Sequence, residues 1–474
     1  MCDFGLFSKR IVRIQIMKRH RGINDAEFLL RRVYCAIGFT AAGHSTFPCS
    51  RCGPDADDGI TLLGDRLPFN TELMAHLTDP QENVVGEVPF ILRAKQSGEI
   101  KPLSITIGGF FNGTYLFERT DTAGKYPILS RFPNVHGSGN TNTEAVINSA
   151  GVAGLISVGD WVTGYAQAEY SETNFRGDQE DVQLREYFVV VGNLDEFPVY
   201  TAIGRKTVDF GEQFGYNPFT HTINQHFFWT LADEPVIELG YVGDDWRVSG
   251  TVANGERMLR VGMTNKRDGG LGTNFAVKAE KTFTFEEDRA LRVSASYLDD
   301  TIYNSNFTAH TVQALNRFGP PNAPRPPAVL VTDNVGLWDV AAEYTTDSYD
   351  LAVEYTRSTE LWPATSYDTN TGAELPGARH LSAVSAMGRY KTDLFGIATD
   401  FSAVYSKSII GPDNTEFDEL TQHVIGMEMH INKYMDIGAE VVFNGGFQPF
   451  VGIQDVSDSG VDSQVGIVGL KLRL

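Results

Sequence analysis

Apolar and polar residues alternate along most of this chain, from about residue 103 to the C-terminus. In the segment 246–252, for example, Trp, Val, Gly and Val occupy one face, whereas Arg, Ser and Thr occupy the other. This period of two is typical of a β-strand with one apolar face. The segments run for about ten residues, which suits a tilted strand that crosses a bilayer, whereas strands of soluble sheets are usually nearer five or six residues. The pattern therefore favours membrane-spanning strands.

Sixteen such segments are present, and the intervals between them alternate in length. The predicted strands are 103–118, 145–158, 161–172, 182–192, 198–207, 235–242, 245–254, 272–284, 288–298, 336–345, 348–357, 378–390, 394–406, 420–431, 434–444 and 463–474. Short turns such as Gly159-Asp160 alternate with longer loops such as 208–234. Short periplasmic turns, long external loops and an even strand number are typical of bacterial outer-membrane barrels. We therefore predict an all-β fold, a transmembrane antiparallel up-and-down β-barrel of about 16 strands over residues 103–474.

The aromatic residues support the same fold. The apolar faces often begin or end in an aromatic side chain, as at Trp246, Tyr297, Trp338, Tyr355 and Tyr405, whereas Ala, Gly and Val fill the middles. Tyr and Trp favour the two membrane interfaces, where the ring lies in hydrocarbon and the polar atom meets water. The alternative is a soluble β-sandwich or propeller, because aromatic residues also favour the strands of soluble sheets.

Composition divides the chain into three parts. Residues 1–52 carry nine Lys or Arg, three acids and all four cysteines, whereas the remainder carries 30 bases and 57 acids. An apolar run after Arg31-Arg32 resembles the core of a secretory signal, so we predict that this basic leader is a cleaved export signal. Residues 53–102 contain several prolines and do not fit the alternation; we predict a short periplasmic or plugging segment there. Residues 103–474 form the predicted barrel.

Charge and cysteine usage argue against several classes of protein. The net charge of −21 argues against a nucleic-acid-binding protein, whose footprint is basic. No stretch reads as a transmembrane helix, which needs roughly 20 mostly apolar residues. Cys49 and Cys52 have the spacing of a metal or redox pair but lack a second pair, and the acidic loops lack the spacing of an EF-hand calcium loop. We therefore predict no metal and no cofactor.

The polar face of the predicted strands is rich in charge. In a barrel this face points into the lumen, which would then hold water rather than a packed core. Lumen charges of opposite sign either pair with one another and stiffen the wall or select solutes, and the sequence leaves both roles open. The residues predicted to line the pore are Arg247, Lys278, Glu280, Arg292, Asp339, Glu343, Asp350 and Glu354.

One predicted external loop combines cations, amides and aromatic rings. It follows Arg205 and Lys206 at the end of a predicted strand, and it contains Asn217 and Thr220. The two bases can attract an anionic solute, and the aromatic residues of the loop can stack on its rings. Long barrel loops also plug or constrict pores. We predict that Arg205, Lys206, Asn217 and Thr220 bind a ligand; the alternative is an ordered loop packed on the barrel mouth.

Catalysis has little support in the sequence. His136 and Ser138, like His380 and Ser382, are two residues apart, which on a strand places a histidine beside a serine that it can activate. Neither pair has an identifiable third residue that would orient the histidine. We therefore predict no catalytic residues, and a protein that is not an enzyme.

The 16-strand pattern and the stretch 204–220, with its G-R-x-x-x-x-F-G…N-P-F-T order, resemble the LbtU-type family of outer-membrane siderophore porins. The resemblance implies a barrel that admits an iron–siderophore without the plug of larger energised receptors. The predicted location is the outer membrane of a Gram-negative bacterium, with outer-membrane lipid and lipopolysaccharide as neighbours, and the oligomeric state is left open. The alternatives are a general diffusion porin, a surface adhesin or structural barrel and, least favoured, an outer-membrane lipid hydrolase.

Overall fold

The structure is a computed structural model of the whole chain. It describes residues 59–62, 65–68, 70–79, 85–124, 126–128, 139–172, 182–228, 230, 235–254, 271–286, 288–299, 335–361, 379–409, 419–446 and 461–474. The predicted leader, residues 1–52, lies outside these described residues. Residues 53–474 form one compact unit.

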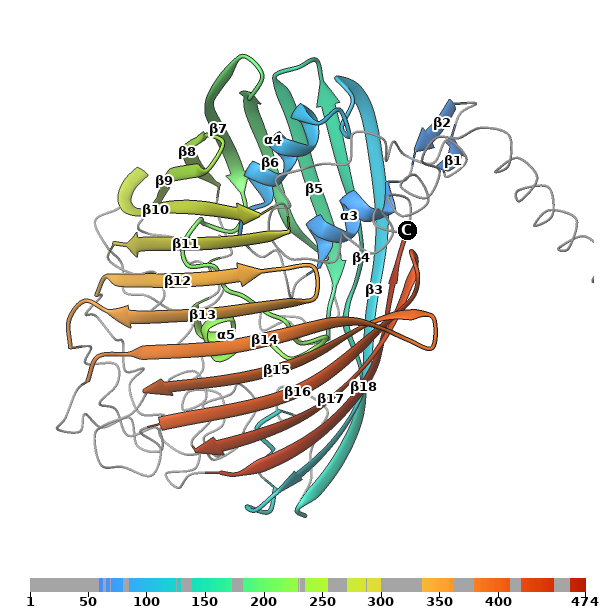
Figure 1. Cartoon of the computed structure of the whole chain (residues 1–474), viewed down its shortest axis with the longest axis vertical. Helices are drawn as coiled ribbons and strands as arrows, with labels where there is room; N and C mark the ends of the chain where they lie inside the picture. Colours follow the sequence, from blue (N-terminus) through green and yellow to red (C-terminus); the bar gives the residue numbers. More distant parts are fainter. Residues whose placement is uncertain are drawn as a thin grey trace, which may run out of the picture. The chain divides into compact units, whose positions relative to one another are not determined.

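In the described part of the chain, sixteen strands form one closed antiparallel barrel (Figure 1). Each strand pairs with its neighbours in sequence, and the last strand closes the barrel by pairing with the first, from Ser463 opposite Thr120 to Arg473 opposite Phe110. The strands are β3 (Leu103–Thr120), β4 (Thr141–Val158), β5 (Val162–Tyr170), β6 (Gln183–Asn193), β7 (Phe197–Arg205), β8 (Val236–Val242), β9 (Trp246–Asn254), β10 (Leu271–Glu286), β11 (Arg289–Leu298), β12 (Leu337–Thr345), β13 (Tyr349–Ser358), β14 (Ser382–Leu394), β15 (Ile397–Ile409), β16 (Glu419–Asn432), β17 (Met435–Gly446) and β18 (Ser463–Arg473). This topology confirms the predicted fold class.

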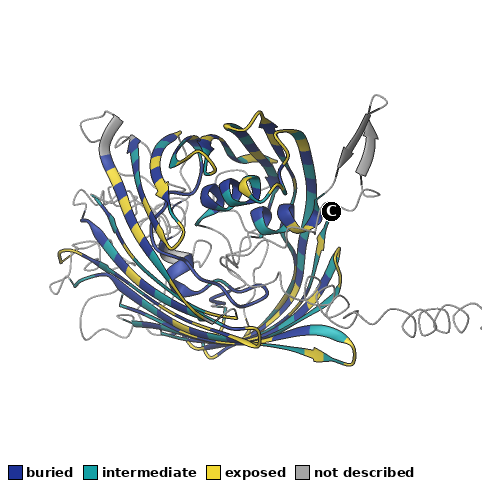
Figure 2. Ribbon diagram, turned by 45° about the horizontal axis from the view of Figure 1, so that its top comes forward, coloured by how far each residue is buried: buried dark blue, intermediate teal, exposed yellow. Residues whose placement is uncertain are grey.

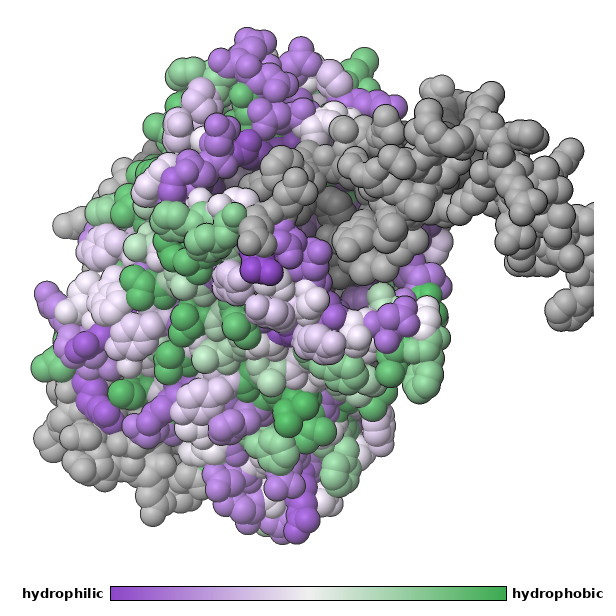
Figure 3. Space-filling model, in the orientation of Figure 1, coloured by the Kyte–Doolittle hydropathy of each residue, from purple (hydrophilic) through white to green (hydrophobic). Residues whose placement is uncertain are grey.

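The outer face of the barrel is apolar, as the alternation requires. On β13, for example, Leu351 and Val353 point outward with about half of their surface exposed, whereas Asp350 and Glu354 on the inner face are buried. Figure 3 shows apolar residues gathered over the middle of the strand wall and hydrophilic residues along its edges. A closed barrel leaves no unpaired strand edge, so its outer wall meets the requirement that hydrocarbon imposes on a polypeptide backbone.

Short connections and long loops alternate around the barrel, and one short connection lies later than predicted. The sequence places the turn between the twelfth and thirteenth barrel strands, β14 and β15, near Lys391–Asp393, but the structure places it at Phe395 and Gly396. Both residues have positive φ angles, 56° and 83°, which suit a tight hairpin turn. The carboxylate of Asp393 accepts the N–H of Gly396 at 2.7 Å. The local turn chemistry, which the alternation does not record, therefore extends β14 to Leu394.

Residues before the barrel form two helices that lie inside the ring of strands (Figure 2). These are α3 (Thr71–Thr78) and α4 (Glu87–Gln96), and they follow a two-stranded sheet of β1 (Gly59–Leu62) and β2 (Asp65–Pro68). Asn70 caps α3, because its side-chain oxygen accepts the N–H of Leu73 at 3.1 Å. Among the described residues, no helix has the length and apolar character needed to cross a membrane.

Candidate functional site

The segment that joins β7 to β8 folds into the barrel and crosses its interior. We call residues 206–230 the inner loop; residue 229 lies outside the described part. The backbone N–H of Glu212 donates to Oε1 of Glu354 on β13 at 2.8 Å. Further along, the N–H of Phe219 donates to Oε1 of Glu440 on β17 at 2.6 Å. The inner loop therefore spans the lumen from β7 to the opposite wall.

Glycine allows the inner loop to approach this wall closely. Gly211 has a φ of +66°, and a Cβ atom added there would lie 3.0 Å from Oε1 of Glu354. A residue with a side chain would have to adopt a disfavoured backbone conformation and push that carboxylate away. Gly211 thus fixes where the inner loop meets β13.

A short helix carries the inner loop back from the far wall. This helix is α5 (Ile223–Phe228), and the hydroxyl of Thr222 accepts the N–H of Gln225 at its start, at 3.1 Å. Within α5, Nδ2 of Asn224 donates to the hydroxyl of Thr356 on β13 at 3.0 Å. The inner loop is therefore fastened to the wall on its return path as well.

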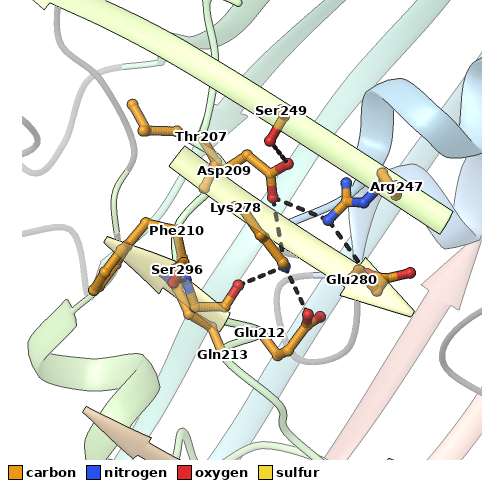
Figure 4. Close-up of polar contacts among 12 residues, drawn as sticks. Thr207, Asp209, Phe210, Glu212, Gln213, Arg247, Ser249, Lys278, Glu280 and Ser296 are labelled. Carbon is orange, nitrogen blue, oxygen red and sulfur yellow. Dashed lines mark hydrogen bonds and ion pairs between the residues drawn. The ribbon is translucent and has the colours of Figure 1, made fainter. Parts of the chain in front are cut away.

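Three bases on the neighbouring strands β9, β10 and β11 hold the acidic part of the inner loop. Figure 4 shows two of them, Arg247 and Lys278, beside Asp209 and Glu212. Asp209 lies 3.0 Å from Arg247 and 3.4 Å from Lys278. Glu212 lies 2.8 Å from Lys278 and 2.9 Å from Arg292. The wall supplies the cations and the inner loop supplies the anions, so the network ties the start of the inner loop to one side of the barrel.

Electrostatics keep Asp209 ionised inside the protein. Burial alone would raise its pKa, but Arg247, Lys278 and Lys206 together hold the pKa of this carboxyl well below its usual range. The hydroxyl of Ser249 also donates to Oδ2 of Asp209, at 2.5 Å. The carboxylate of Asp209 keeps all of these partners only while the inner loop is docked against the wall. The network therefore favours the docked loop.

The structure places all eight residues predicted to line the pore on the inner face of the barrel. Seven of them are buried, and Arg292 keeps a side-chain exposure of 12%. Most are engaged with the inner loop or with each other: Arg292, for instance, lies 2.9 Å from Glu212 and 2.8 Å from Glu343. Asp350 pairs instead with Arg389 at 2.8 Å and with Lys391 at 2.9 Å on the neighbouring strand. Mutual pairing of this kind stiffens the wall. A role for these residues in solute passage stays a prediction.

The four residues predicted to bind a ligand occupy different environments. Arg205 shares the outer face of β7 with Ile203 and donates to the carbonyl oxygen of Leu184 at 3.0 Å. Lys206 turns inward and is buried, with Nζ 2.6 Å from Glu238 on β8. The two bases therefore point to opposite sides of the wall.

Asn217 and Thr220 lie together at the far end of the inner loop. Nδ2 of Asn217 donates to the carbonyl oxygen of Thr220 at 3.2 Å, and the hydroxyl of Thr220 donates to Oε2 of Glu440 at 2.5 Å. Both side chains are buried in contacts within the protein. These contacts hold the far end of the inner loop in place. They do not test the predicted role of Asn217 and Thr220 in ligand binding.

Replacing Lys206 with methionine is expected to destabilise the protein far more than replacing Arg205 with alanine. Loss of the ammonium group leaves Glu238 buried without its cation, which typically costs about 3–5 kcal/mol. Arg205 is on the surface, where substitutions usually change stability by about 0.5 kcal/mol or less. Urea-unfolding midpoints of the two variants in lipid vesicles measure the difference. Equal midpoints for the two variants would contradict the buried ion pair between Lys206 and Glu238.

The helices α3 and α4 cover a part of the inner wall that is apolar rather than charged. Their buried residues pack with inward-facing residues of β4 to β8 in a single hydrophobic cluster. From the helices it contains Leu73, Met74, Leu77, Val88, Ile91, Leu92 and Ala94, and from the strands Ala153, Leu155, Tyr165, Phe188, Val190, Tyr200, Ala202 and Val242. The lumen is thus divided between an apolar wall under the helices and a charged wall under the inner loop.

Polar contacts fix the helices on that wall. The hydroxyl of Tyr165 donates to the carbonyl oxygen of Leu77 at 3.2 Å, and Nζ of Lys95 donates to the hydroxyl of Thr163 at 3.1 Å. At the start of α4, burial and a hydrogen-bonded neighbour, Glu186, raise the pKa of Glu87 well above its usual range. Glu186 in turn accepts the N–H of Thr207 at 3.0 Å, so this residue touches both the helix and the inner loop.

The sequence carried a signal for these helices. Leu73, Met74 and Leu77, like Val88, Ile91 and Leu92, recur at helical spacing. Short helices of eight and ten residues give weak periodicity, and the prolines around them obscure it further. Residues 53–102, predicted to be a short periplasmic or plugging segment, therefore contain helices that the period-two analysis could not show.

Comparison with known proteins gives distant similarities. No family model matches the chain. A curated UPF0422 protein from Coxiella burnetii is 31% identical over 104 residues, and this match spans 22% of the chain and only 22% of that relative.

Among solved structures, the loop L8 deletion mutant of the outer membrane protein OmpT of Vibrio cholerae is 14% identical, with a TM-score of 0.46 over 79% of this chain and 100% of that one. The outer membrane channel DcaP of Acinetobacter baumannii is 13% identical, with a TM-score of 0.47 over 78% and 97%. An anion-selective porin from Comamonas acidovorans is 9% identical, with a TM-score of 0.47 over 78% and 99%.

The geometry of the barrel itself decides its class. The described strands close without a free edge, the outer face is apolar, and a loop with charged contacts crosses the interior. The chain is a closed, 16-stranded transmembrane β-barrel of the kind that bacterial outer membranes contain.

The remaining candidate sites of this barrel lie partly outside the described residues. Nδ1 of His380 contacts the carbonyl oxygen of Ser358 at 3.0 Å. His136 and Ser138 lie outside the described residues, as do the acidic stretches 178–181 and 455–460. Within the described ranges, no group of three or more His, Cys, Asp or Glu side chains is placed to hold a metal ion.

Proposed function

We propose that this barrel is a passive channel for small hydrophilic solutes, and that the inner loop constricts it. The proposal rests on the division of the interior described above. The apolar part of the wall is covered by α3 and α4, whereas other parts of the wall keep ionisable groups partly exposed. A water-filled route along charged side chains is what the lumen of a diffusion channel requires.

The observation that carries the proposal is a set of partly exposed ionisable side chains on the inner face, toward the end of the barrel with short turns. We call this set the vestibule. Each side chain keeps between 12% and 20% of its surface exposed, more than Arg247, Lys278 and the two loop carboxylates that they bind. Five of the six side chains are basic, but each base pairs with at least one carboxylate, so the vestibule favours weak rather than strict charge selectivity. Its residues are Arg292, Lys391, Glu428, His430, Lys471 and Arg473.

Conductance in planar lipid bilayers tests the proposal. The purified full chain should form ion-conducting pores, and a variant in which residues 211–220 are replaced by a short Gly-Ser linker should conduct several times more. The linker removes the contacts to Glu354 and Glu440 but leaves every strand intact. A barrel that assembles normally but conducts in neither form would overturn the channel proposal and point to an adhesin or a structural barrel.

The second candidate function is uptake of an anionic iron–siderophore, which is what the resemblance to siderophore porins implies. The row of Arg247, Lys278 and Arg292 supports this candidate, because these bases now bind the carboxylates of Asp209 and Glu212. A ligand with several carboxylates would compete with the two loop acids for the same cations. Its binding would therefore be coupled to movement of the inner loop.

Iron-dependent transport distinguishes the two candidates. A deletion strain in iron-poor medium should take up a labelled carboxylate siderophore more slowly than the parent strain if the narrower function holds. Complementation with Arg205→Ala/Lys206→Ala tests the sequence-based ligand prediction, provided that the amount of assembled barrel is matched. Unchanged uptake in the deletion strain, together with unselective conductance, leaves the general diffusion channel as the function.

A further inference from the structure

The far end of the inner loop sits in a recess made by three glycines. Pro218 and Phe219 pack against Gly426 on β16, Gly438 on β17 and Gly469 on β18. Gly438 and Gly469 are paired across their two strands, and Gly426 lies opposite Glu440 on β17. The glycines therefore form a continuous patch without side chains on three neighbouring strands.

A side chain at any of these positions would collide with the inner loop. A Cβ atom added to Gly438 would lie 2.8 Å from Cε2 of Phe219 and 2.9 Å from Cβ of Pro218. At Gly469 it would lie 2.5 Å from Cζ of Phe219, and at Gly426 it would lie 2.9 Å from Cδ of Pro218. Contacts this short do not occur between real side chains, so the recess exists only because all three residues are glycine.

The glycines stand out from the other inner-face positions of the same strands. In the middle of this wall, Val424, Val442, Val465 and Ile467 carry buried side chains on the inner face. Glycine inside a strand weakens it and marks a place where another group approaches closely. Here the approaching group is the tip of the inner loop.

A carboxylate completes the recess. Oε1 of Glu440 accepts the N–H groups of Phe219 and Thr220 at 2.6 and 3.1 Å, and Oε2 accepts the hydroxyl of Thr220 at 2.5 Å. Glu440 is only 3% exposed. Shape and hydrogen bonding thus select the same four-residue tip, Asn217 to Thr220.

We propose that Gly426, Gly438, Gly469 and Glu440 form a socket that positions the tip of the inner loop and thereby sets the aperture of the channel. This inference rests on the proposed channel function. The socket lies across the lumen from β7, where the inner loop begins, so its contacts hold the loop at its greatest reach. Loss of the socket contacts frees the tip, whereas Asp209 and Glu212 still anchor the start of the loop.

Two variants test the socket from opposite sides. Gly438→Val fills the recess from the wall, and Phe219→Ala removes the ring from the loop without changing any strand. Both should assemble as heat-modifiable barrels, conduct more than the wild type and admit larger neutral sugars in a liposome-swelling assay. Gly466→Val is the control for adding a valine to β18 away from the socket: Gly466 lies on the outer face, and a Cβ atom there meets nothing within 4 Å. Its conductance should equal that of the wild type.

The outcomes separate the socket from the channel function itself. A conducting wild type with a more conductive linker variant upholds the channel, and wild-type conductance and sugar exclusion in both Gly438→Val and Phe219→Ala would then overturn the socket. If Gly438→Val does not assemble, Phe219→Ala alone decides. A wild type that does not conduct at all rejects the channel proposal first.

Discussion

Replacing Val353 with arginine is expected to destabilise the inserted barrel by about 2–4 kcal/mol, the cost of a lipid-facing arginine or lysine near the bilayer midplane. Val353 lies in the middle of β13 on the outer face and is 45% exposed. The residues directly opposite it on the two neighbouring strands, Ala342 and Ala386, offer the guanidinium no polar side chain. The heat-modifiable gel shift and the urea-unfolding midpoint in vesicles measure the loss.

The same strand provides a control variant and a native arginine for comparison. Val353→Ile keeps the face apolar and should assemble normally. Arg357, four residues further along β13 on the same outer face, is a native arginine near the end of the strand, where the side chain reaches the water interface. An arginine at position 353 that leaves the unfolding midpoint unchanged would show that this face does not meet lipid.

Replacing Ile91 with alanine is expected to weaken the docking of the helices by about 2–5 kcal/mol, the usual range for such a truncation in a packed core. Ile91 is completely buried in the cluster between α4 and the apolar wall. Once α4 leaves the wall, the peptide bonds after Arg93 and Lys95 become open to trypsin. Limited proteolysis of protein in vesicles whose short-turn ends face outward therefore reports the change directly.

Gln96→Ala is the matched control for Ile91→Ala. Gln96 lies on the exposed side of the same helix, so its truncation removes no core contact. Cleavage should stay slow in the control and become fast in Ile91→Ala. Equal cleavage of both variants would mean that the helices are held by their polar contacts, such as those of Lys95 and Tyr165, rather than by the cluster.

Much of the barrel is predictable from the sequence because one physical rule governs every strand. Lipid outside and water or charge inside force a period of two, so segments such as 246–252 and 349–358 identify themselves without reference to their partners. The turn at Phe395 and Gly396 escaped prediction because it depends on backbone angles that the alternation does not encode.

The interior was less predictable, because its contacts join distant parts of the chain. The inward fold of the loop after Arg205 follows from its length and composition, but its destination does not. Glu440 is 220 residues from Thr220, and nothing in the local sequence of either residue indicates the other. Each glycine of the socket is ordinary in a barrel sequence. Their shared role is visible only in the structure, where three neighbouring strands bring them together. Likewise, nothing in the sequence distinguishes Lys206 from an exposed cation; only the structure places it beside Glu238.

The apolar inner wall also has a consequence for biogenesis. Strands β4 to β8 carry apolar residues on both faces, like the strands of a sheet buried on both sides. Before the helices dock, this part of the sheet would expose surface that promotes aggregation with other unfinished chains. Only residues 97–102 separate α4 from β3, so the helices are tethered close to the wall that they cover. A short tether gives a high effective concentration. We therefore expect α3 and α4 to cover this apolar surface while the barrel assembles.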